Sequence, residues 1–384
     1  MSLKPLVVEK GIIQPSSGEI KRSIFFKKNI IKAGVLTSAG LPVRQSGVVV
    51  EEWNLVSPFR INPSKTKIKY VDDDVIYFSI PQRHFGHVLT GTMGFAYILL
   101  NSYYKNHKIV FIDKEPCEAE LILLGHLGIN PSSIITVREY TQFKSVTIIK
   151  PSLRISWLTP KIIPKRILER VFRINIEFID TFRAIAQKFN TRIDGVEHSP
   201  NKIYFSRKLF HINHIICEDK IEQVFEKNGY TIYYPEQLPL DEQIRLVANA
   251  DFYACIQGTL EHHSLFMKDG ATLIVMSRSS QRTDRQVFID KLQTKIKHVY
   301  LRTHVQPIKD RRFPYIIGLT RDLIKFFDEN NFLYDKEELK PTYQDLSEYI
   351  KQCLGLGGRR DSFLIKYILR KTVRYHKSFW KQIK

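Results

Sequence analysis

Two histidines and a serine–arginine pair offer the clearest chemistry in the sequence. Ser206 and Arg207 directly follow an apolar run, and Arg207 could donate a forked pair of hydrogen bonds to a diphosphate without titrating. His87, with His84 one helical turn before it, lies in a predicted helix and could accept a proton from a hydroxyl group. Each has a structural alternative, because Arg207 could be a solvated surface residue and His87 a hydrogen-bonded histidine of the core.

A glycine marks a second candidate group. Gln257, Gly258 and Thr259 follow an apolar strand pattern and open a helix whose first turn holds His262 and His263. Backbone N–H groups at the start of a helix bind anions, and a glycine lets a phosphate approach closely. Adjacent histidines point to different faces of a helix, so this pair is a poor metal chelate and only one of the two is expected to face a ligand.

The elements that must position these residues alternate between strand and helix from residue 202 to 303. Strand patterns cover 202–206, 231–234, 251–257, 272–276 and 298–302, and helix patterns cover 218–228, 240–248, 258–267 and 284–297. Repeated β-α-β units predict a parallel, doubly wound sheet. The ligand crevice of such a sheet lies at the carboxyl ends of its strands, where Arg207 and Gly258 fall.

The first half alternates less cleanly, which predicts a second α/β domain. Strand patterns cover 75–80, 108–113, 134–137 and 145–149, and helix patterns cover 85–104, 117–127 and 162–189. Residues 190–201 have linker composition. We therefore predict an N-terminal domain over 1–195, a C-terminal domain over 196–330 and a basic helical tail over 331–384.

Composition narrows the class of protein. A hydrophobic content of 43% excludes a disordered chain, and the net charge of +20 implies an anionic partner, whether a nucleic acid, a phosphorylated small molecule or a lipid surface. No apolar stretch approaches the ~18 residues that cross a bilayer, and the four cysteines are widely spaced. A cytoplasmic location is expected.

The charge is concentrated near the end of the chain. Residues 359–384 carry nine Lys and Arg against one acid, Asp361, and apolar residues recur among them at roughly helical spacing. This pattern is typical of a helix that lies on an anionic membrane surface. The alternative is a helix that folds back on the N-terminal domain.

The run from IYFSR to TLIVM resembles glycosyltransferase family 61. The residues that carry the resemblance are Ser206-Arg207, Gly229-Tyr230, Pro235-Glu236, Gln243, Ala250-Asp251, and Gly258 through Phe266-Met267. The segment HFGHVLTGTMGFAYIL resembles the acceptor-side helix of the family, with His87 at the position of the family histidine. The chain departs from the family pattern at Gln257, His263 and Val275, where His, Asn and Glu are usual.

The resemblance implies an inverting glycosyltransferase that takes a sugar from a nucleotide donor, commonly a UDP-sugar, without an obligatory metal. Two Rossmann-like domains facing a cleft are the architecture called GT-B. In that arrangement Arg207 and the start of the Gly258 helix would hold the diphosphate, and Ser206 would also lie at the donor. His263 or His262 would form a hydrogen bond to a phosphate oxygen or to a sugar hydroxyl. Glu236 and Gln243 would contact the nucleoside, although Gln243 could equally be a helix-surface residue.

The remaining expectations concern the metal, the acceptor and the rival functions. Asp72-Asp73-Asp74 contains a D-x-D string, but it precedes a strand in the acceptor half, so we predict a turn and no metal site. His87 is the expected base, with His84 as its substitute. We expect a glycan or lipid-linked acceptor in cell-surface polysaccharide or capsule synthesis, at the inner face of the cell membrane.

The alternative functions are another GT-B sugar transferase and a basic nucleic-acid-binding protein. No known nucleic-acid-binding motif accompanies the positive charge.

Overall fold

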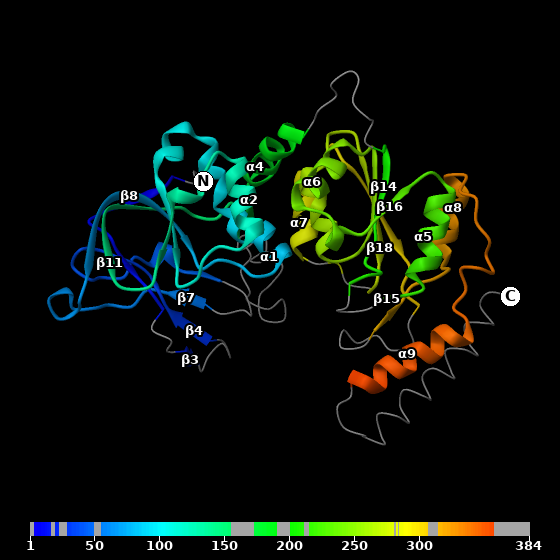
Figure 1. The fold of residues 1–384 in the computed structure, drawn as a ribbon, viewed down its shortest axis with the longest axis horizontal. Coiled ribbons are helices and arrows are strands. Elements are labelled where there is room, and N and C mark those ends of the chain that lie inside the picture. Colours follow the sequence, from blue (N-terminus) through cyan, green and yellow to red (C-terminus); the bar gives the residue numbers. More distant parts are fainter. Residues whose placement is uncertain are drawn as a thin grey trace. The chain divides into compact units, whose positions relative to one another are not determined.

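The computed structural model divides into two compact units, Met1–Lys188 and Phe189–Lys384. Each unit has its own sheet and its own core (Figure 1). The structure describes residues 4–16, 20–22, 29–49, 55–154, 173–189, 200–210, 215–279, 282, 284–305 and 314–356. The predicted boundary between residues 195 and 196 lies outside the described residues, as does the basic segment 359–384.

The C-terminal unit is built on a five-stranded sheet in the order β16-β14-β17-β18-β19. Its strands are β14 (Lys202–Phe205), β16 (Thr231–Tyr233), β17 (Phe252–Ile256), β18 (Thr272–Ser277) and β19 (Lys297–Arg302). Every pairing in the sheet is parallel, which confirms the parallel sheet predicted for residues 202–303. Numbered along the chain, the strand order is 2-1-3-4-5, the order of the flavodoxin-like doubly wound sheets.

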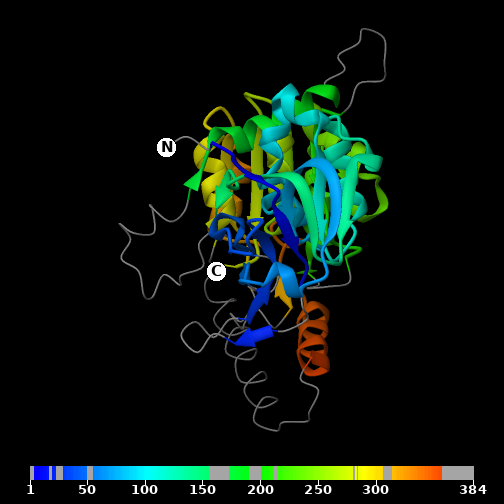
Figure 2. The ribbon, with the colours of Figure 1, turned by 90° about the vertical axis from the view of Figure 1, so that its left-hand side faces the viewer.

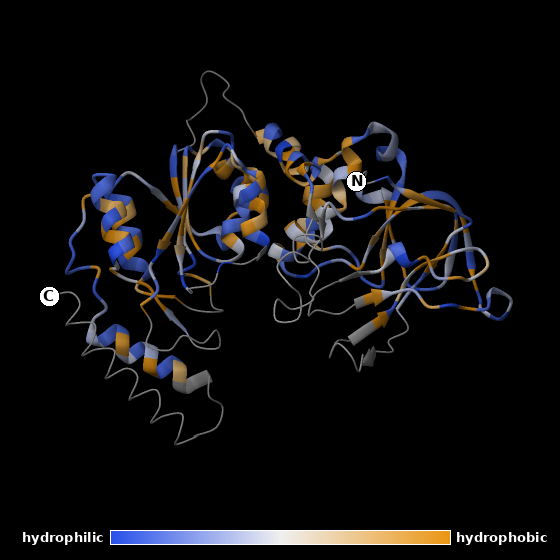
Figure 3. Cartoon of the chain, turned by 180° about the vertical axis from the view of Figure 1, so that it is seen from behind, coloured by the Kyte–Doolittle hydropathy of each residue, from blue (hydrophilic) through white to orange (hydrophobic). Residues whose placement is uncertain are grey.

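Helices cover both faces of this sheet (Figure 1). Helices α5 (Glu218–Lys227) and α8 (Arg321–Glu329) lie on one face, and α6 (Leu240–Asn249) and α7 (Asp284–Leu292) lie on the other. Phe225 of α5 and Phe327 of α8 pack against alternate strand residues such as Tyr204. Hydrophobic residues therefore concentrate in the strands and recur in patches along the helices (Figure 3).

Two predicted helices of the C-terminal unit differ in the structure. The helix predicted from residue 258 is a 3₁₀ helix, η10 (Thr259–Phe266), which follows Gly258 in a positive-φ conformation. The helix predicted over 284–297 ends at Leu292, because residue 297 already begins β19. The short parallel pair β15 (Ile215–Ile216) and β20 (Tyr315–Ile316) was not predicted, and α9 (Tyr343–Leu356) packs beside it (Figures 1 and 2).

The N-terminal unit contains a seven-stranded mixed sheet. Its strands are β1 (Leu6–Glu9), β2 (Ile12–Gln14), β5 (Gly34–Leu36), β8 (Lys69–Ser79), β9 (Lys108–Ile112), β10 (Ile134–Val137) and β11 (Thr141–Ile148). Strands β10-β9-β8-β11 are parallel, whereas β1 and β2 pair antiparallel with β11, and β5 pairs antiparallel with β2. A separate four-stranded sheet has the order β3 (Ile20–Arg22), β4 (Asn29–Lys32), β7 (Leu55–Ser57) and β6 (Val48–Val49). A two-stranded sheet pairs β12 (Leu153–Arg154) with β13 (Arg173–Ile174). The unit is α/β, as predicted, with antiparallel strands that the sequence pattern did not reveal.

The helices of the N-terminal unit are shorter than the sequence predicted. The predicted helix 85–104 is the short helix α1 (Phe85–Thr90) followed by three 3₁₀ segments. Gly91 ends α1 in a turn so tight that an added Cβ atom would lie 2.6 Å from the His87 carbonyl oxygen. Helices α2 (Glu118–His126) and α4 (Ile176–Ala186) are the other described α-helices of this unit, and 162–172 of the predicted helix 162–189 lie outside the described residues. Among the described helices, none is long and apolar enough to cross a bilayer.

Candidate functional site

The strand order of the C-terminal unit has a switch point. The chain leaves β14 for β16 on one side and then returns to β17 on the other, so the order reverses between β14 and β17. Doubly wound sheets bind ligands at such a switch point, outside the carboxyl ends of the strands. Arg207 follows β14 and Gly258 follows β17, so the two parts of the predicted donor site lie on neighbouring strands.

Arg207 is buried at this point and faces a second arginine. Its side chain is only 8% exposed, and its Nε atom is buried without a hydrogen-bond partner among the described residues. A Cβ atom added to Gly258 would lie 3.8 Å from Nη1 of Arg207 and 3.3 Å from Nη2 of Arg278, which follows β18. Burial, and then the charge of Arg278, lower the pKa of Arg207 to about 10, so the guanidinium stays protonated near neutral pH. The two cations thus meet beside a residue without a side chain.

Two buried carboxylates of α5 hold the turn that carries Arg207. Oε1 of Glu218 accepts hydrogen bonds from the Tyr204 hydroxyl (3.1 Å) and the Arg207 backbone N–H (2.8 Å). Glu222, one turn further, accepts a short hydrogen bond from the Ser206 hydroxyl and lies 3.8 Å from Nζ of Lys208. Burial raises the pKa of Glu218 to about 7, although the hydrogen bond from the Arg207 backbone lowers it. Burial also raises the pKa of Glu222. The Ser206 hydroxyl therefore already donates its hydrogen bond to a carboxylate of the protein.

The turn after β17 depends on its glycine. Gly258 adopts φ 138° and ψ −144°, a conformation that side chains with a Cβ atom rarely adopt. The preceding Gln257 is buried, and its Oε1 accepts from the backbone N–H (3.3 Å) and the hydroxyl (3.4 Å) of Ser279. Gln257 thus joins the end of β17 to the loop that follows β18 and Arg278.

Both predicted histidines of η10 are buried and have protein partners. Nε2 of His263 lies 2.9 Å from Oε1 of Gln243, whose amide group donates to two backbone carbonyls and so presents only its oxygen to the ring. Burial lowers the pKa of His263 to about 3, so this ring is neutral at physiological pH. Nδ1 of His262 lies 2.7 Å from Oε1 of Gln286 on α7. The structure connects η10 to α6 and α7 through these rings, and a contact of either ring with a donor stays a prediction.

The other two residues predicted for this site lie nearer its surface. Glu236 is exposed in the turn after β16. Its negative charge raises the pKa of Arg207, whereas burial lowers it. Thr259 is half-buried and is the first residue of η10. Both belong to the same unit and the same end of the sheet as Arg207.

In the N-terminal unit, a buried carboxylate fixes the segment that contains the two candidate bases. His84 is the exposed N-cap residue of α1 and His87 is half-buried within it, with the two ring centroids 5.7 Å apart. Glu120 of α2 is fully buried and accepts from the Gln82 backbone N–H (3.0 Å) and the Thr92 hydroxyl. The carboxylate therefore holds both ends of the segment 82–92, although nothing in the sequence pattern pointed to Glu120.

The D-x-D string does not form the predicted turn. Asp72, Asp73 and Asp74 lie within β8, because the strand begins at Lys69 rather than at residue 75. Lys108 pairs with Asp73 at 2.7 Å, and Lys144 pairs with Asp74 at 2.9 Å. Across the described residues, no group of three or more His, Cys, Asp or Glu side chains is arranged to hold a metal ion.

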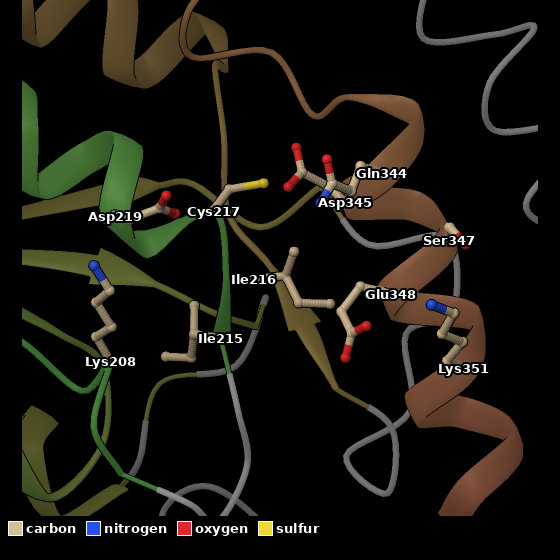
Figure 4. A pocket seen from close by; sticks show the side chains of 10 residues that line it. All are labelled: Lys208, Ile215, Ile216, Cys217, Asp219, Gln344, Asp345, Ser347, Glu348 and Lys351. Atoms are coloured by element: carbon tan, nitrogen blue, oxygen red, sulfur yellow. The ribbon is translucent and has the colours of Figure 1, made fainter.

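A shallow pocket lies beside the site, between β15 and α9 (Figure 4). Lys208 and Asp219 form one wall, and Asp345, Glu348 and Lys351 of α9 form the other. Lys208 directly follows Arg207 in the chain. The residues predicted to bind the donor are not among those that line this pocket.

The sequence interpretation missed Arg278, although a signal for it exists. The strand β14 runs into Phe205-Ser206-Arg207, and β18 runs into Met276-Ser277-Arg278. The same dipeptide thus ends the two strands that flank β17. Because the carboxyl ends of parallel strands meet at one edge of a sheet, this repetition could have placed both arginines together.

Comparison with known proteins assigns the chain to a family. Residues 73–275, a little over half of the chain, match the family described as Glycosyltransferase 61, so the chain belongs to that family. Its activity is therefore that of a glycosyltransferase. A comparison with curated proteins gives no match.

Proposed function

We propose that the protein is an inverting glycosyltransferase that uses a nucleotide-sugar donor, with a UDP-sugar as the first candidate. The observation that carries this proposal is the convergence of Arg207 and Gly258 at the switch point of the parallel sheet, within the segment that matches the family. A buried guanidinium and an unobstructed backbone suit a diphosphate. Glu236 and Gln243 are the proposed contacts to the nucleoside. No metal is required in this proposal.

The acceptor side is proposed for the N-terminal unit, in a GT-B arrangement of the two units. The acceptor hydroxyl would attack the anomeric carbon, lose its proton to His87, and displace the nucleoside diphosphate. Glu120 would act indirectly, by holding the segment that carries His87 and His84. A glycan or lipid-linked acceptor of cell-surface or capsule polysaccharide synthesis is proposed, with the protein at the inner face of the cell membrane.

One experiment separates donor binding from chemistry. The full-length protein is screened with a panel of nucleotide sugars for release of the nucleoside diphosphate, and nucleotide affinity is measured by calorimetry. Arg207→Ala should weaken nucleotide binding by about 10- to 100-fold, the range for one hydrogen bond to a charged group. His87→Ala should leave that affinity unchanged and lower turnover by roughly 10² to 10⁴, the contribution of a general base.

Two controls keep the result interpretable. His126→Ala replaces another half-buried histidine of the N-terminal unit and should preserve turnover. His84→Ala tests the substitute base. Unchanged nucleotide affinity in Arg207→Ala would reject the donor site, and near-normal turnover of a folded His87→Ala protein would return His87 to a structural role.

A further inference from the structure

We propose that Arg278 is a second arginine of the diphosphate subsite, so that Arg207 and Arg278 hold the donor diphosphate together over Gly258. This proposal rests on the proposed function and names a residue that the resemblance to the family did not supply.

The sheet topology brings the two arginines to one point. Strand β17 lies between β14 and β18 and is parallel to both. Arg207 leaves the carboxyl end of one flanking strand and Arg278 leaves the carboxyl end of the other. Gly258 lies two residues beyond the end of the central strand, and a Cβ atom there would lie within 4 Å of both guanidinium groups.

The distances show that both guanidinium groups reach this space. A Cβ atom at Gly258 would lie 3.3 Å from Nη2 and 3.5 Å from Cζ of Arg278, and 3.8 Å from Nη1 of Arg207. Each guanidinium also packs its face on an aromatic ring, Arg207 on Phe210 (4.6 Å to the centroid) and Arg278 on Tyr315 (5.0 Å). A stacked guanidinium donates hydrogen bonds in its own plane. The atom of each arginine nearest to a Cβ at Gly258 is a terminal guanidinium nitrogen, which can donate a hydrogen bond.

The charges favour an anion between the two groups. Two like charges held beside each other in a partly desolvated site repel, and the charge of Arg278 lowers the pKa of Arg207 after burial does, while the charges of Glu218 and Glu236 act in the opposite direction. A ligand with two phosphoryl groups would relieve this repulsion by offering one group to each cation. A single phosphoryl group would satisfy the pair less well.

The same arrangement assists the departure of the leaving group. In the transfer step, the bond between the anomeric carbon and the terminal phosphate oxygen breaks, and its electron pair stays on that oxygen. The nucleoside diphosphate therefore gains one negative charge as the acceptor oxygen bonds to the anomeric carbon and gives up its proton. Two positioned cations stabilise that developing charge.

The test measures binding of nucleoside diphosphates (UDP, GDP, ADP, dTDP and CDP), the matching monophosphates and inorganic diphosphate to the full-length protein by calorimetry. For the nucleotide that binds best, Arg278→Gln and Arg207→Gln should each weaken diphosphate binding by about 10- to 100-fold and monophosphate binding by less. Arg278→Lys keeps the positive charge but loses the planar group that can donate two parallel hydrogen bonds. Its diphosphate affinity should lie between those of Arg278→Gln and the wild type. Inorganic diphosphate should bind more weakly than the nucleotide and lose affinity in the same variants.

Arg302→Gln is the matched control. Arg302 ends β19, the next strand of the sheet, pairs in register with Ser277, and is exposed near Asp322. This variant should bind like the wild type. The rise in Tm on adding nucleotide should shrink in Arg278→Gln and stay unchanged in Arg302→Gln.

The outcomes distinguish the two proposals. If Arg207→Gln loses affinity while Arg278→Gln binds like Arg302→Gln, the donor site stands and the role of Arg278 is wrong. If the wild type binds none of the nucleotides, both proposals fail. Inorganic diphosphate that binds as tightly as the nucleotide would overturn the assignment of this subsite to a donor.

Discussion

Single buried ionisable residues decide how the site at the end of the parallel sheet is held. Glu218 contributes no surface to the crevice, yet its carboxylate accepts from the backbone N–H of Arg207 and from the Tyr204 hydroxyl. Its other oxygen, Oε2, is buried and has no hydrogen-bond partner among the described residues. From the sequence, Glu218 reads only as an acidic residue in the first turn of a helix, which is a common position. Its role appears only when the strand end and the helix start are placed together.

Glu218 should make the stability of the protein depend on pH in a defined direction. Burial raises its folded-state pKa from an ordinary value of 4.5 to about 7, so its contribution to the free energy of unfolding is fully present below pH 4.5 and is lost as pH rises through 7. The whole effect is at most roughly 3 kcal/mol. Glu218→Gln keeps an oxygen that accepts both hydrogen bonds and cannot ionise. It should therefore lose less stability than the wild type between pH 5 and pH 8.

Urea unfolding at the two pH values measures this difference. Glu226→Gln, an exposed position on the same helix, is the control and should follow the wild type. Equal pH dependence in Glu218→Gln and the wild type would show that the Glu218 carboxylate is solvated rather than buried.

At the scale of elements, the sequence predicted the strands and helices of the C-terminal unit well because their hydrophobic periods are clean. Every strand predicted between 202 and 303 is present, and the strands that precede Arg207 and Gly258 each end one residue earlier than predicted, at Phe205 and Ile256. The helices that fail, over 85–104 and 258–267, contain or follow glycines whose backbone conformations end or tighten the helix. Hydrophobic periodicity does not distinguish an α-helix from successive 3₁₀ turns, and local glycine geometry decided both cases.

The turn between β17 and η10 supports a prediction about Gly258. Gly258→Ala places a Cβ atom 3.3 Å from Nη2 of Arg278 and in a backbone region that costs a side chain about 1–3 kcal/mol. We expect a loss of UDP affinity of at least about tenfold, because the methyl group enters the space proposed for the phosphate. Gly229→Ala is the matched control, since Gly229 also has a positive φ (81°) but no atom within 4 Å of an added Cβ. That variant should lose stability and keep UDP affinity.

Thermal melts and calorimetry separate the two effects. Both variants should melt at a lower temperature than the wild type, and only Gly258→Ala should bind UDP weakly. Wild-type affinity in a folded Gly258→Ala protein would exclude a phosphate from this turn.

At the scale of the whole molecule, the fold class could be predicted from the sequence, whereas part of the strand pairing could not. The sequence pattern predicts an α/β protein with two compact units. It does not predict the antiparallel strands of the N-terminal sheet, because their apolar runs are short and their partner strands lie far away in the chain. The net charge of +20 is a property of the whole chain, and +8 of it belongs to 359–384. Composition therefore points to a second anionic partner besides the donor diphosphate.

The last prediction concerns that partner. The apolar residues of 359–384 recur at roughly helical spacing among nine cations, so we expect this segment to bind an anionic membrane, where each cation near the surface adds about 1 kcal/mol. Deleting 359–384 should abolish cosedimentation with vesicles that contain anionic lipid, and binding of the intact protein should weaken as salt rises. Nucleotide affinity should survive the deletion, because Arg207 and Gly258 lie in the parallel sheet. A variant with the tail cations replaced by glutamine should lose the preference for anionic vesicles. If the intact protein ignores anionic vesicles and the truncated protein fails to fold, the segment packs on the protein itself and the membrane proposal is wrong.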